Sequence, residues 1–274
     1  KNAVLERADV YNFHACIANK WNKKNVFLAG DSAHQMPPFM GAGMGTGIRD
    51  IANLSWKIDL FLKKLSTKDI FKTYQSERYP HAQWSIDQTV SIGEIIEGFC
   101  ASEEGKEFKP SRKSYDAKFP HIPNGIYSNP KDKITGYPVP QPTLFKDKKE
   151  VRLDSLIKSK FAIISNVNEL KISKKAKKII EKLDIQFIFI DKYDDPENRM
   201  CKIFQLYEYV LVRPDLYVYG GADKKNISKD QFSSLYWFSN LFSLILFSLK
   251  AHELKDPLAP SGVQGQVTRV VCHT

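Results

Sequence analysis

The stretch Gly30–Lys57, GDSAHQMPPFMGAGMGTGIRDIANLSWK, constrains the fold of this chain more than any other part of its sequence. The apolar run Val26–Ala29 precedes it and predicts a short buried strand bounded by Gly30. Pro37 and Pro38 then keep the chain extended, because the residue before a proline avoids the helical conformation. Apolar residues at helical spacing predict a helix after the loop: Ile48, Ile51, Leu54, Ile58, Leu62 and Leu65.

Four glycines mark the place where the loop turns into the predicted helix: Gly41, Gly43, Gly45 and Gly47. A glycine-rich loop lets a ligand approach the first backbone N–H groups of a helix, which lack a partner within the helix. The helix dipole adds partial positive charge there, so the junction favours an anion or a group that gains negative charge. Asp31 can accept hydrogen bonds from sugar or ribityl hydroxyls. The alternative is a corner whose glycines serve only packing, but the combination of Gly-Asp, Pro-Pro and four glycines favours a binding site.

The same stretch resembles the second flavin-binding motif of the group A FAD-dependent aromatic hydroxylases, especially the 3-(3-hydroxyphenyl)propionate and phenol hydroxylase branch. The resemblance implies that Asp31 binds the ribityl chain of FAD and that the isoalloxazine ring lies against Pro38 and the loop Gly41–Gly47. Backbone N–H groups near Met44–Thr46 would face the pyrimidine edge of the ring. The cofactor-binding residues that it implies are Gly30, Asp31, Pro38, Gly41, Gly43, Met44, Gly45 and Thr46. Many members have Asn at the position of Gly45, so a side-chain anchor for the flavin is lost here.

Two further segments carry the resemblance. TYQSERYPHAQ, residues 73–83, contains the Tyr-x-x-Glu-Arg pattern of the family, and taken alone it predicts a scaffold helix with i,i+4 charge pairs. LVRPDLYVYGG, residues 211–221, resembles the Leu-Val-Arg-Pro-Asp segment of the thioredoxin-like C-terminal domain of the family. The chain has no CxxC, so we expect packing and oligomerisation from such a domain rather than thiol–disulfide exchange.

Residues 1–99 are predicted to be the C-terminal part of an FAD-binding and substrate domain. Residues 4–28 predict two short strands and a turn, and by the resemblance the side chains of Tyr11, Phe13 and His14 would lie near a substrate, although sheet core is the commoner role. His34 is expected to be structural. Two helices are expected after a cap at Ser66 or Thr67: one ends at Pro80, and the other runs from about residue 81 to 99.

Residues 100–142 are rich in Pro, Gly, Lys and Ser and predict a linker, in which Gly136–Pro142 is extended. Residues 143–249 are predicted to form the thioredoxin-like domain, followed by a tail over residues 250–274. The expected elements are a βαβ unit with strands Phe161–Ser165 and Gln186–Ile190 around the basic helix Lys171–Lys182, then a hairpin of Glu208–Arg213 and Leu216–Tyr219. The predicted fold class is therefore α/β (α+β): a partial FAD-binding domain of the aromatic-hydroxylase type, then a thioredoxin-like domain.

Composition excludes several other classes of protein. The formal net charge of the 274 residues is +10, but the lysines are spread out, and the densest group predicts an amphipathic helix with a solvated basic face rather than a nucleic-acid site. The four cysteines are widely spaced, which argues against a metal site and a disulfide framework and suits a reducing cytoplasm. The charge-free run Phe232–Leu249 has a length at the lower edge for a membrane span, and its apolar arc favours a docked amphipathic helix.

No GxGxxG fingerprint follows a strand anywhere in the sequence. In the family this fingerprint lies in an N-terminal part that binds the ADP half of FAD. We therefore expect the chain to be the C-terminal portion of an FAD-dependent aromatic-ring monooxygenase. By the resemblance it hydroxylates a small phenolic substrate with NAD(P)H and O2. The rest of the enzyme then belongs either to a longer chain or to a partner, and homo-oligomerisation is a separate alternative. The alternatives are a non-catalytic remnant or interaction protein with the same fold, or another flavin enzyme such as an epoxidase or a reductase. No side chain is assigned a catalytic role.

Overall fold

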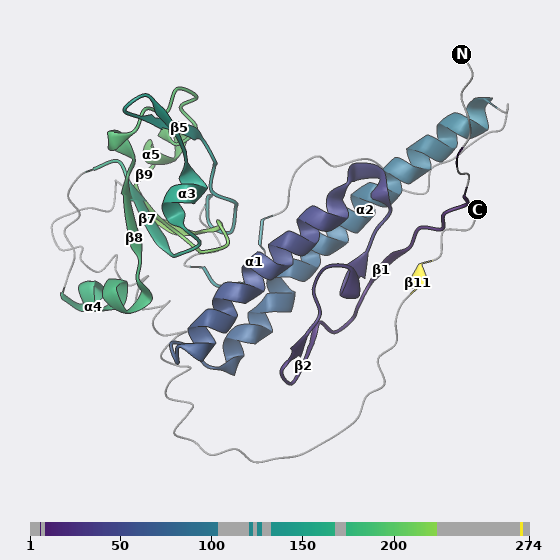
Figure 1. Ribbon diagram of the computed structural model, residues 1–274, viewed down its shortest axis with the longest axis horizontal. Helices are drawn as coiled ribbons and strands as arrows, with labels where there is room; N and C mark the ends of the chain where they lie inside the picture. Colours follow the sequence, from purple (N-terminus) through teal and green to yellow (C-terminus); the bar gives the residue numbers. More distant parts are fainter. Residues whose placement is uncertain are drawn as a thin grey trace. The chain divides into compact units, whose positions relative to one another are not determined.

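The computed structural model describes residues 6, 9–103, 121–122, 125–127, 133–167, 174–223 and 269–270 (Figure 1). The contacts divide the chain into two compact units. The first unit comprises residues 1–48, 81–119 and 261–274, and the second comprises residues 49–80 and 120–260. The boundaries between the units fall inside both long helices of the chain, so each helix contributes residues to each unit.

The first unit contains short strands around the loop that precedes the first long helix. Its strands are β1 (Ala15–Ile17), β2 (Asn22–Lys23), β3 (Val26–Phe27), β4 (His34–Gln35) and β11 (Arg269–Val270). Strands β11, β1 and β4 form one antiparallel sheet in this order, and β2 pairs with β3. The prediction of a buried strand over Val26–Ala29 is wrong. It is a two-residue arm of a hairpin, and Val26 is 67% exposed, because β2 is its one partner in the described sheets.

The two long helices are α1 (Ala42–Leu62) and α2 (Lys72–Glu103) (Figure 1). The predicted helix after the glycine loop is confirmed as α1. The predicted break at Pro80 is wrong, because α2 continues through it. A proline inside a helix costs about 3 kcal/mol, whereas each large side chain that is fully buried contributes about 1.5–3 kcal/mol. The flanking residues that are buried against the rest of the protein include Tyr74, Ala82 and Ile86, and their burial offsets the missing N–H. Thr67 caps the short helix η3 (Lys68–Phe71), where its hydroxyl accepts from the Asp69 N–H.

The second unit is built around a four-stranded sheet in the order β10-β9-β7-β8. Strands β7 (Ala162–Ser165) and β8 (Gln186–Phe189) are parallel and are connected through α4 (Lys174–Leu183), which confirms the predicted βαβ unit. Strands β9 (Tyr207–Val212) and β10 (Val218–Asp223) form the predicted hairpin. The remaining elements are the hairpin β5 (Thr143–Lys146) and β6 (Lys149–Arg152), helices α3 (Leu153–Ile157) and α5 (Cys201–Phe204), and the short helix η4 (Ile190–Lys192).

The core of this unit lies between the sheet and the elements that cover it. Its buried members include Leu144, Leu153, Ile164, Val210 and Val212. The extended segment Gly136–Pro142 lies along the start of β10, where Gly136 N–H donates to Val218 O and Val139 N–H donates to Leu216 O. This contact confirms the prediction that the segment docks on a surface. Helix α4 buries Ile179 and exposes Lys177, Lys178 and Lys182, as its amphipathic pattern predicts.

Some sequence predictions fall outside the described residues, namely the charge-free run Phe232–Leu249 and most of the tail. Among the helices that are described, none combines the length and the apolar character that crossing a bilayer requires. Cys16 and Cys100 are free thiols. Within the same described ranges, no group of three or more His, Cys, Asp or Glu side chains is arranged to hold a metal ion.

Candidate functional site

The loop between β3 and α1 begins with a close approach of two glycines. Gly30 opens the short helix η1 (Gly30–Ser32) with φ +57°, a left-handed conformation that glycine adopts without strain. A Cβ added at Gly47, in the second turn of α1, would lie 3.1 Å from the Cα of Gly30. The end of the strand and the helix therefore meet backbone to backbone. Asp31, the next residue of η1, is exposed to solvent.

The Pro-Pro segment leads into a second left-handed glycine. Pro38 begins the short helix η2 (Pro38–Met40), and Gly41 ends it with φ +59° while its N–H donates to Pro38 O at 2.8 Å. A Cβ added at Gly41 would meet no atom within 4 Å. The side of Gly41 on which other residues carry a side chain is therefore open space, directly before the N-terminus of α1.

The first turns of α1 contain four of the predicted cofactor-binding residues, Gly43, Met44, Gly45 and Thr46, so these residues are helical rather than part of a loop. Met44 is 79% exposed, whereas Thr46 is buried. The Thr46 hydroxyl donates to Ala42 O at 2.8 Å and lies 3.4 Å from the Ser85 hydroxyl of α2. Its side chain thus stabilises the helix pair, and its backbone N–H lies beyond the first turn of α1, where the helix itself supplies the partner.

The two histidines near this loop have different environments. His34 is buried, and its ring centroid lies 5.4 Å from that of Trp21, which is itself fully buried. Trp21 in turn donates its indole N–H to Ala18 O. This packing agrees with the structural role expected for His34. His14 is exposed.

A buried charge cluster, formed by Asn53, Lys57, Glu77, Arg213 and Asp215, lies in the second unit. The carboxylate of Glu77 accepts from Arg213 Nη2 at 2.7 Å, Lys57 Nζ at 2.9 Å and Asn53 Nδ2 at 2.6 Å. These three bonds are made by Oε2 of Glu77, and its other oxygen, Oε1, accepts from the Ile126 backbone N–H at 2.7 Å. Arg213 also binds Asp215, at 2.6 Å and 2.9 Å. The cluster holds two cations and two carboxylates, so its formal net charge is zero.

The pKa values in this cluster follow from burial and from the paired charges. Burial alone would raise the pKa of Glu77, but Arg213 and Lys57 outweigh it and lower that pKa to about 2. Burial is the largest influence on Lys57 and lowers its pKa to about 8, against the attraction of Glu77. For Arg213, the attraction of Asp215 and Glu77 outweighs burial and raises the pKa. Glu77 and Arg213 are therefore both ionised at neutral pH.

Residues 73–83 lie in α2, which confirms the predicted scaffold helix, but the predicted i,i+4 charge pairs are wrong. Glu77 and Arg78 are 0% and 1% exposed, and their partners lie on other elements. Arg78 Nε donates to Asp50 of α1 at 2.9 Å, while Glu77 binds Arg213 at the end of β9. The two segments that carried the family resemblance, Tyr-x-x-Glu-Arg and Leu-Val-Arg-Pro-Asp, thus meet in one cluster. No helical periodicity could reveal partners that are 136 residues apart in the sequence.

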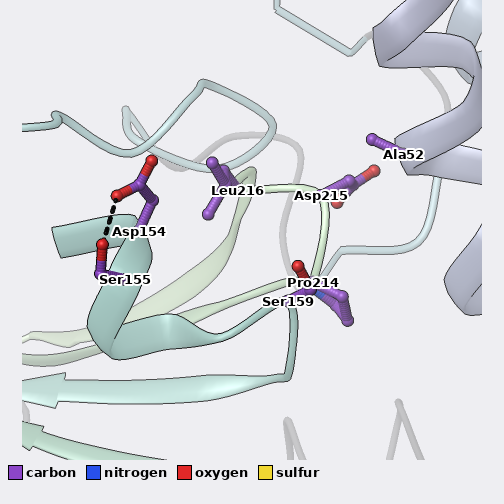
Figure 2. Close-up of a pocket in the computed structure, with 7 residues that line it drawn as sticks. All are labelled: Ala52, Asp154, Ser155, Ser159, Pro214, Asp215 and Leu216. Carbon is purple, nitrogen blue, oxygen red and sulfur yellow. Dashed lines mark hydrogen bonds between the residues drawn. The ribbon is translucent and has the colours of Figure 1, made fainter. Parts of the chain in front are cut away.

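An open pocket lies beside this cluster (Figure 2). Its lining residues are Ala52, Asp154, Ser155, Ser159, Pro214, Asp215 and Leu216. Asp154 and Ser155 come from α3, and Asp215 already binds Arg213 and Asn53. None of the eight predicted cofactor-binding residues lines this pocket. We therefore assign it no part in cofactor binding.

Comparisons with known proteins identify what this chain is similar to. Residues 2–89 match the family model described as FAD binding domain. A probable NADH-specific resorcinol 4-hydroxylase of Rhodococcus jostii is 33% identical over 136 residues, which cover 47% of this chain and 26% of that protein. A 3-(3-hydroxy-phenyl)propionate/3-hydroxycinnamic acid hydroxylase of Escherichia coli is 39% identical over 95 residues, which cover 35% of this chain and 17% of that protein. The match thus spans about a quarter or less of the length of these relatives.

Solved structures share the fold. Aklavinone-11 hydroxylase, in a ternary complex with FAD and aklavinone, aligns with a TM-score of 0.66 and 18% identity over 86% of this chain and 46% of that chain. The flavin-dependent monooxygenase PieE, in complex with FAD and substrate, aligns with a TM-score of 0.63 and 17% identity over 87% of this chain and 50% of that chain. The resemblance to FAD-dependent hydroxylases that the motifs indicated is confirmed.

Proposed function

We propose that this chain, which resembles the FAD-dependent aromatic hydroxylases, is the C-terminal portion of a monooxygenase that hydroxylates a phenolic ring with NAD(P)H and O2. The observation that carries the proposal is the geometry of the loop from Gly30 to Thr46. It combines an exposed carboxylate at Asp31, a left-handed Gly41 beside open space and the N-terminus of a 21-residue helix. The family match over residues 2–89 and the names of the relatives support the same reading.

The residues of the loop fit a flavin. The open space at Gly41, which any Cβ would enter, gives a planar ring access to the backbone, and exposed Met44 lies beyond it in the sequence. Asp31 would accept hydrogen bonds from the ribityl hydroxyls, and Pro38 and Gly41 would lie against the ring system. The backbone N–H groups of Gly43 and Met44, in the first turn of α1, would face its pyrimidine edge, where the helix dipole stabilises negative charge. When bound, the flavin supplies the redox chemistry with NAD(P)H and O2, and the protein holds and shields it.

The proposal includes the organisation of the whole enzyme. Residues 1–99 belong to the FAD-binding and substrate domain, 100–142 form a linker, and 143–249 form a thioredoxin-like domain for packing and oligomerisation. A βαβ unit followed by an antiparallel hairpin, in the strand order β10-β9-β7-β8, supports the thioredoxin-like assignment. The ADP half of FAD would bind an N-terminal part that carries the GxGxxG fingerprint. The solved structures support this division, because the chain covers only 46–50% of the two hydroxylases compared above. We expect the enzyme to be cytoplasmic.

Flavin retention by the purified chain tests the proposed site. The chain is incubated with excess FAD, the free cofactor is removed by gel filtration, and the visible absorbance that stays with the protein is measured. We expect Asp31→Ala to lower the retained flavin about tenfold, the loss that follows from removing a charged hydrogen-bond acceptor. The matched control is Asp59→Ala, which removes another exposed carboxylate, paired on the surface with Lys63.

The outcomes separate the proposal from its alternative. Flavin that is retained by the wild type and by Asp59→Ala, but lost from Asp31→Ala, supports a flavin site at this loop. NADH oxidation that depends on a phenolic substrate would then support the monooxygenase. Equal retention in all three proteins places the flavin elsewhere. Wild-type protein that retains no flavin and oxidises no NADH contradicts a flavin site that this chain forms by itself.

A further inference from the structure

The pocket beside the buried charge cluster has the size of a small-molecule site (Figure 2). Its cavity volume is about 370 Å³, at the lower end of the roughly 300–1,000 Å³ that ligand pockets enclose. Its wall is formed by α1, by α3 with the residues that follow it, and by the turn between β9 and β10. Figure 2 shows Asp154 and Ser155 at one end of the pocket, and Asp215 with Ala52 at the other. A ligand that fills the pocket therefore contacts separate parts of the second unit at once.

The charge of the pocket favours a cation. The described residues that line it include two carboxylates and two hydroxyls but no Lys or Arg, although the formal net charge of the chain is +10. Asp154 is exposed and accepts from the Ser155 hydroxyl at 3.4 Å. It forms no ion pair with any residue that the structure describes. Its negative charge is thus available to a positively charged ligand.

Asp215 provides a fixed acceptor at the other end of the pocket. It is 8% exposed, and Arg213 and Asn53 donate to it in three hydrogen bonds of 2.6–2.9 Å. A carboxylate accepts at about four positions, so about one is left for a ligand. Because Arg213 already balances the charge of Asp215, this end suits a neutral donor such as a hydroxyl group better than a second cation.

Two residues that line the pocket have left-handed backbones although neither is glycine. Ser159 has φ +53° and Leu216 has φ +66°. This conformation is unfavourable for residues with a side chain, and residues held in it often belong to ligand sites. Glycine would remove the strain, but it would also remove the hydroxyl of Ser159 and the apolar wall that Leu216 provides. A ligand that uses both groups explains why both side chains are present.

We propose that this pocket binds a small aliphatic ammonium ion that also carries a hydroxyl group. The ammonium group pairs with Asp154, the carbon chain lies against Leu216 and Ala52, and the hydroxyl donates to Asp215. The Ser159 hydroxyl adds a hydrogen bond to the ligand. This site goes beyond the proposed function, since the pocket contains none of the predicted cofactor-binding residues.

Saturation-transfer NMR on the full chain at pH 7 and low salt measures the binding, with 4-amino-1-butanol as the probe. 1,4-Butanediol has a similar length without the charge, and 4-hydroxybutyrate carries the opposite charge, so both should bind more weakly. We expect Asp154→Asn to weaken binding of 4-amino-1-butanol about three- to tenfold, the range for one lost charge contact near the surface. The matched control is Asp147→Asn, which removes an exposed carboxylate from the β5–β6 turn and should leave binding unchanged.

Two further variants test the cavity itself. Ala52→Leu fills the space without changing any charge, and it should weaken binding at least tenfold if the carbon chain lies inside the pocket. Ser159→Gly removes the hydroxyl and should weaken binding about threefold, the effect of one lost hydrogen bond. The denaturation midpoint of Ser159→Gly should not fall below that of the wild type, because glycine adopts the left-handed conformation without strain.

Several results would overturn the proposal. They are wild-type protein that does not bind the probe, equal binding of 4-amino-1-butanol and 1,4-butanediol, or tighter binding of 4-hydroxybutyrate. Equal weakening by Asp147→Asn and Asp154→Asn would reduce the effect to general surface charge, and a folded Ala52→Leu that binds as the wild type does would refute the cavity. Asp31→Ala should bind the probe as the wild type does, because Asp31 belongs to the first unit. Loss of the flavin site and loss of this site are therefore distinguishable.

Discussion

Replacing Glu77 by Gln tests how much the buried charge cluster contributes to the stability of the second unit. The substitution keeps the size of the side chain and removes its charge. Lys57 and Arg213, both 0% exposed, would then share a single carboxylate, that of Asp215. The formal charge of the cluster changes from zero to +1 in a place from which water is excluded. Buried charges without partners are costly, so we expect a large loss of stability.

Two estimates of the magnitude agree. Removing one partner of a buried ion pair typically costs about 3–5 kcal/mol. Independently, the pKa of Glu77 falls from its ordinary value of 4.5 to about 2 in the folded protein. Each unit of pKa corresponds to about 1.4 kcal/mol, so the ionised carboxylate stabilises the fold by about 3 kcal/mol. This amount is a large part of the roughly 5–15 kcal/mol that holds a typical domain folded.

Guanidinium unfolding at pH 7, followed by circular dichroism, measures the effect. The control is Glu97→Gln, on an exposed position of the same helix, and it should change the unfolding free energy by less than about 0.5 kcal/mol. The decisive variant is Glu77→Gln/Lys57→Met, which returns the cluster to zero net charge. It should recover at least half of the loss. A loss below about 1 kcal/mol for Glu77→Gln, or a double variant in which the two single losses simply add, would refute the reasoning.

Further measurements test the same structure. The unfolding free energy should fall as the pH is lowered from about 4.5 to about 2, because Glu77 takes up a proton in the unfolded chain at a higher pH than in the folded protein. Glu77→Gln should lack this contribution. It should rise between about pH 8 and 10.5, because Lys57 loses its proton in the folded protein first, and Lys57→Met should lack that rise. Gly47→Ala should lower the unfolding free energy by about 1–3 kcal/mol, because its Cβ would press on the backbone of Gly30. Gly41→Asn should lower it by less than about 1 kcal/mol, because Gly41 lies beside open space. Denaturant titrations compare the two variants. Pro80→Ala should raise the unfolding free energy by about 1–3 kcal/mol, since it returns an N–H to the interior of α2, and a decrease in the midpoint would contradict this.

Local patterns predicted the parts of the fold that short-range physics decides. The βαβ unit around α4 and the hairpin across Pro214 were visible because apolar runs and turn residues mark them directly. The β5–β6 hairpin was not predicted. Its two-residue turn, Asp147-Lys148, has φ of +50° and +62°, which sequences usually mark with Asn-Gly or Asp-Gly. Here a lysine occupies the second position, so the usual signal is missing.

The sequence predicted the backbone of the candidate site but not the contacts of its side chains. Gly30 and Gly41 are left-handed, and α1 begins directly after Gly41, as an alternation of glycines before a helical pattern suggests. The role of Thr46 was less visible, because its hydroxyl is engaged by Ala42 and Ser85. The contact between Phe39 and Gly93 was invisible, since a glycine inside a helix reveals nothing about the ring that occupies its empty side.

The misread charges of α2 show why a motif has to be interpreted together with its partner. Charged residues such as Glu77 and Arg78 are usually found at the surface of a helix. Here Asp50, on α1, and Arg213, after β9, neutralise their charges and so offset the cost of burying them. Gly125 completes the arrangement, because a Cβ there would clash with the Glu77 carboxylate, which accepts from the Ile126 N–H. A buried cluster of zero net charge is stable only as a whole. Tyr-x-x-Glu-Arg and Arg-Pro-Asp are therefore two halves of one structural feature, and either half alone predicts the wrong environment for its charges.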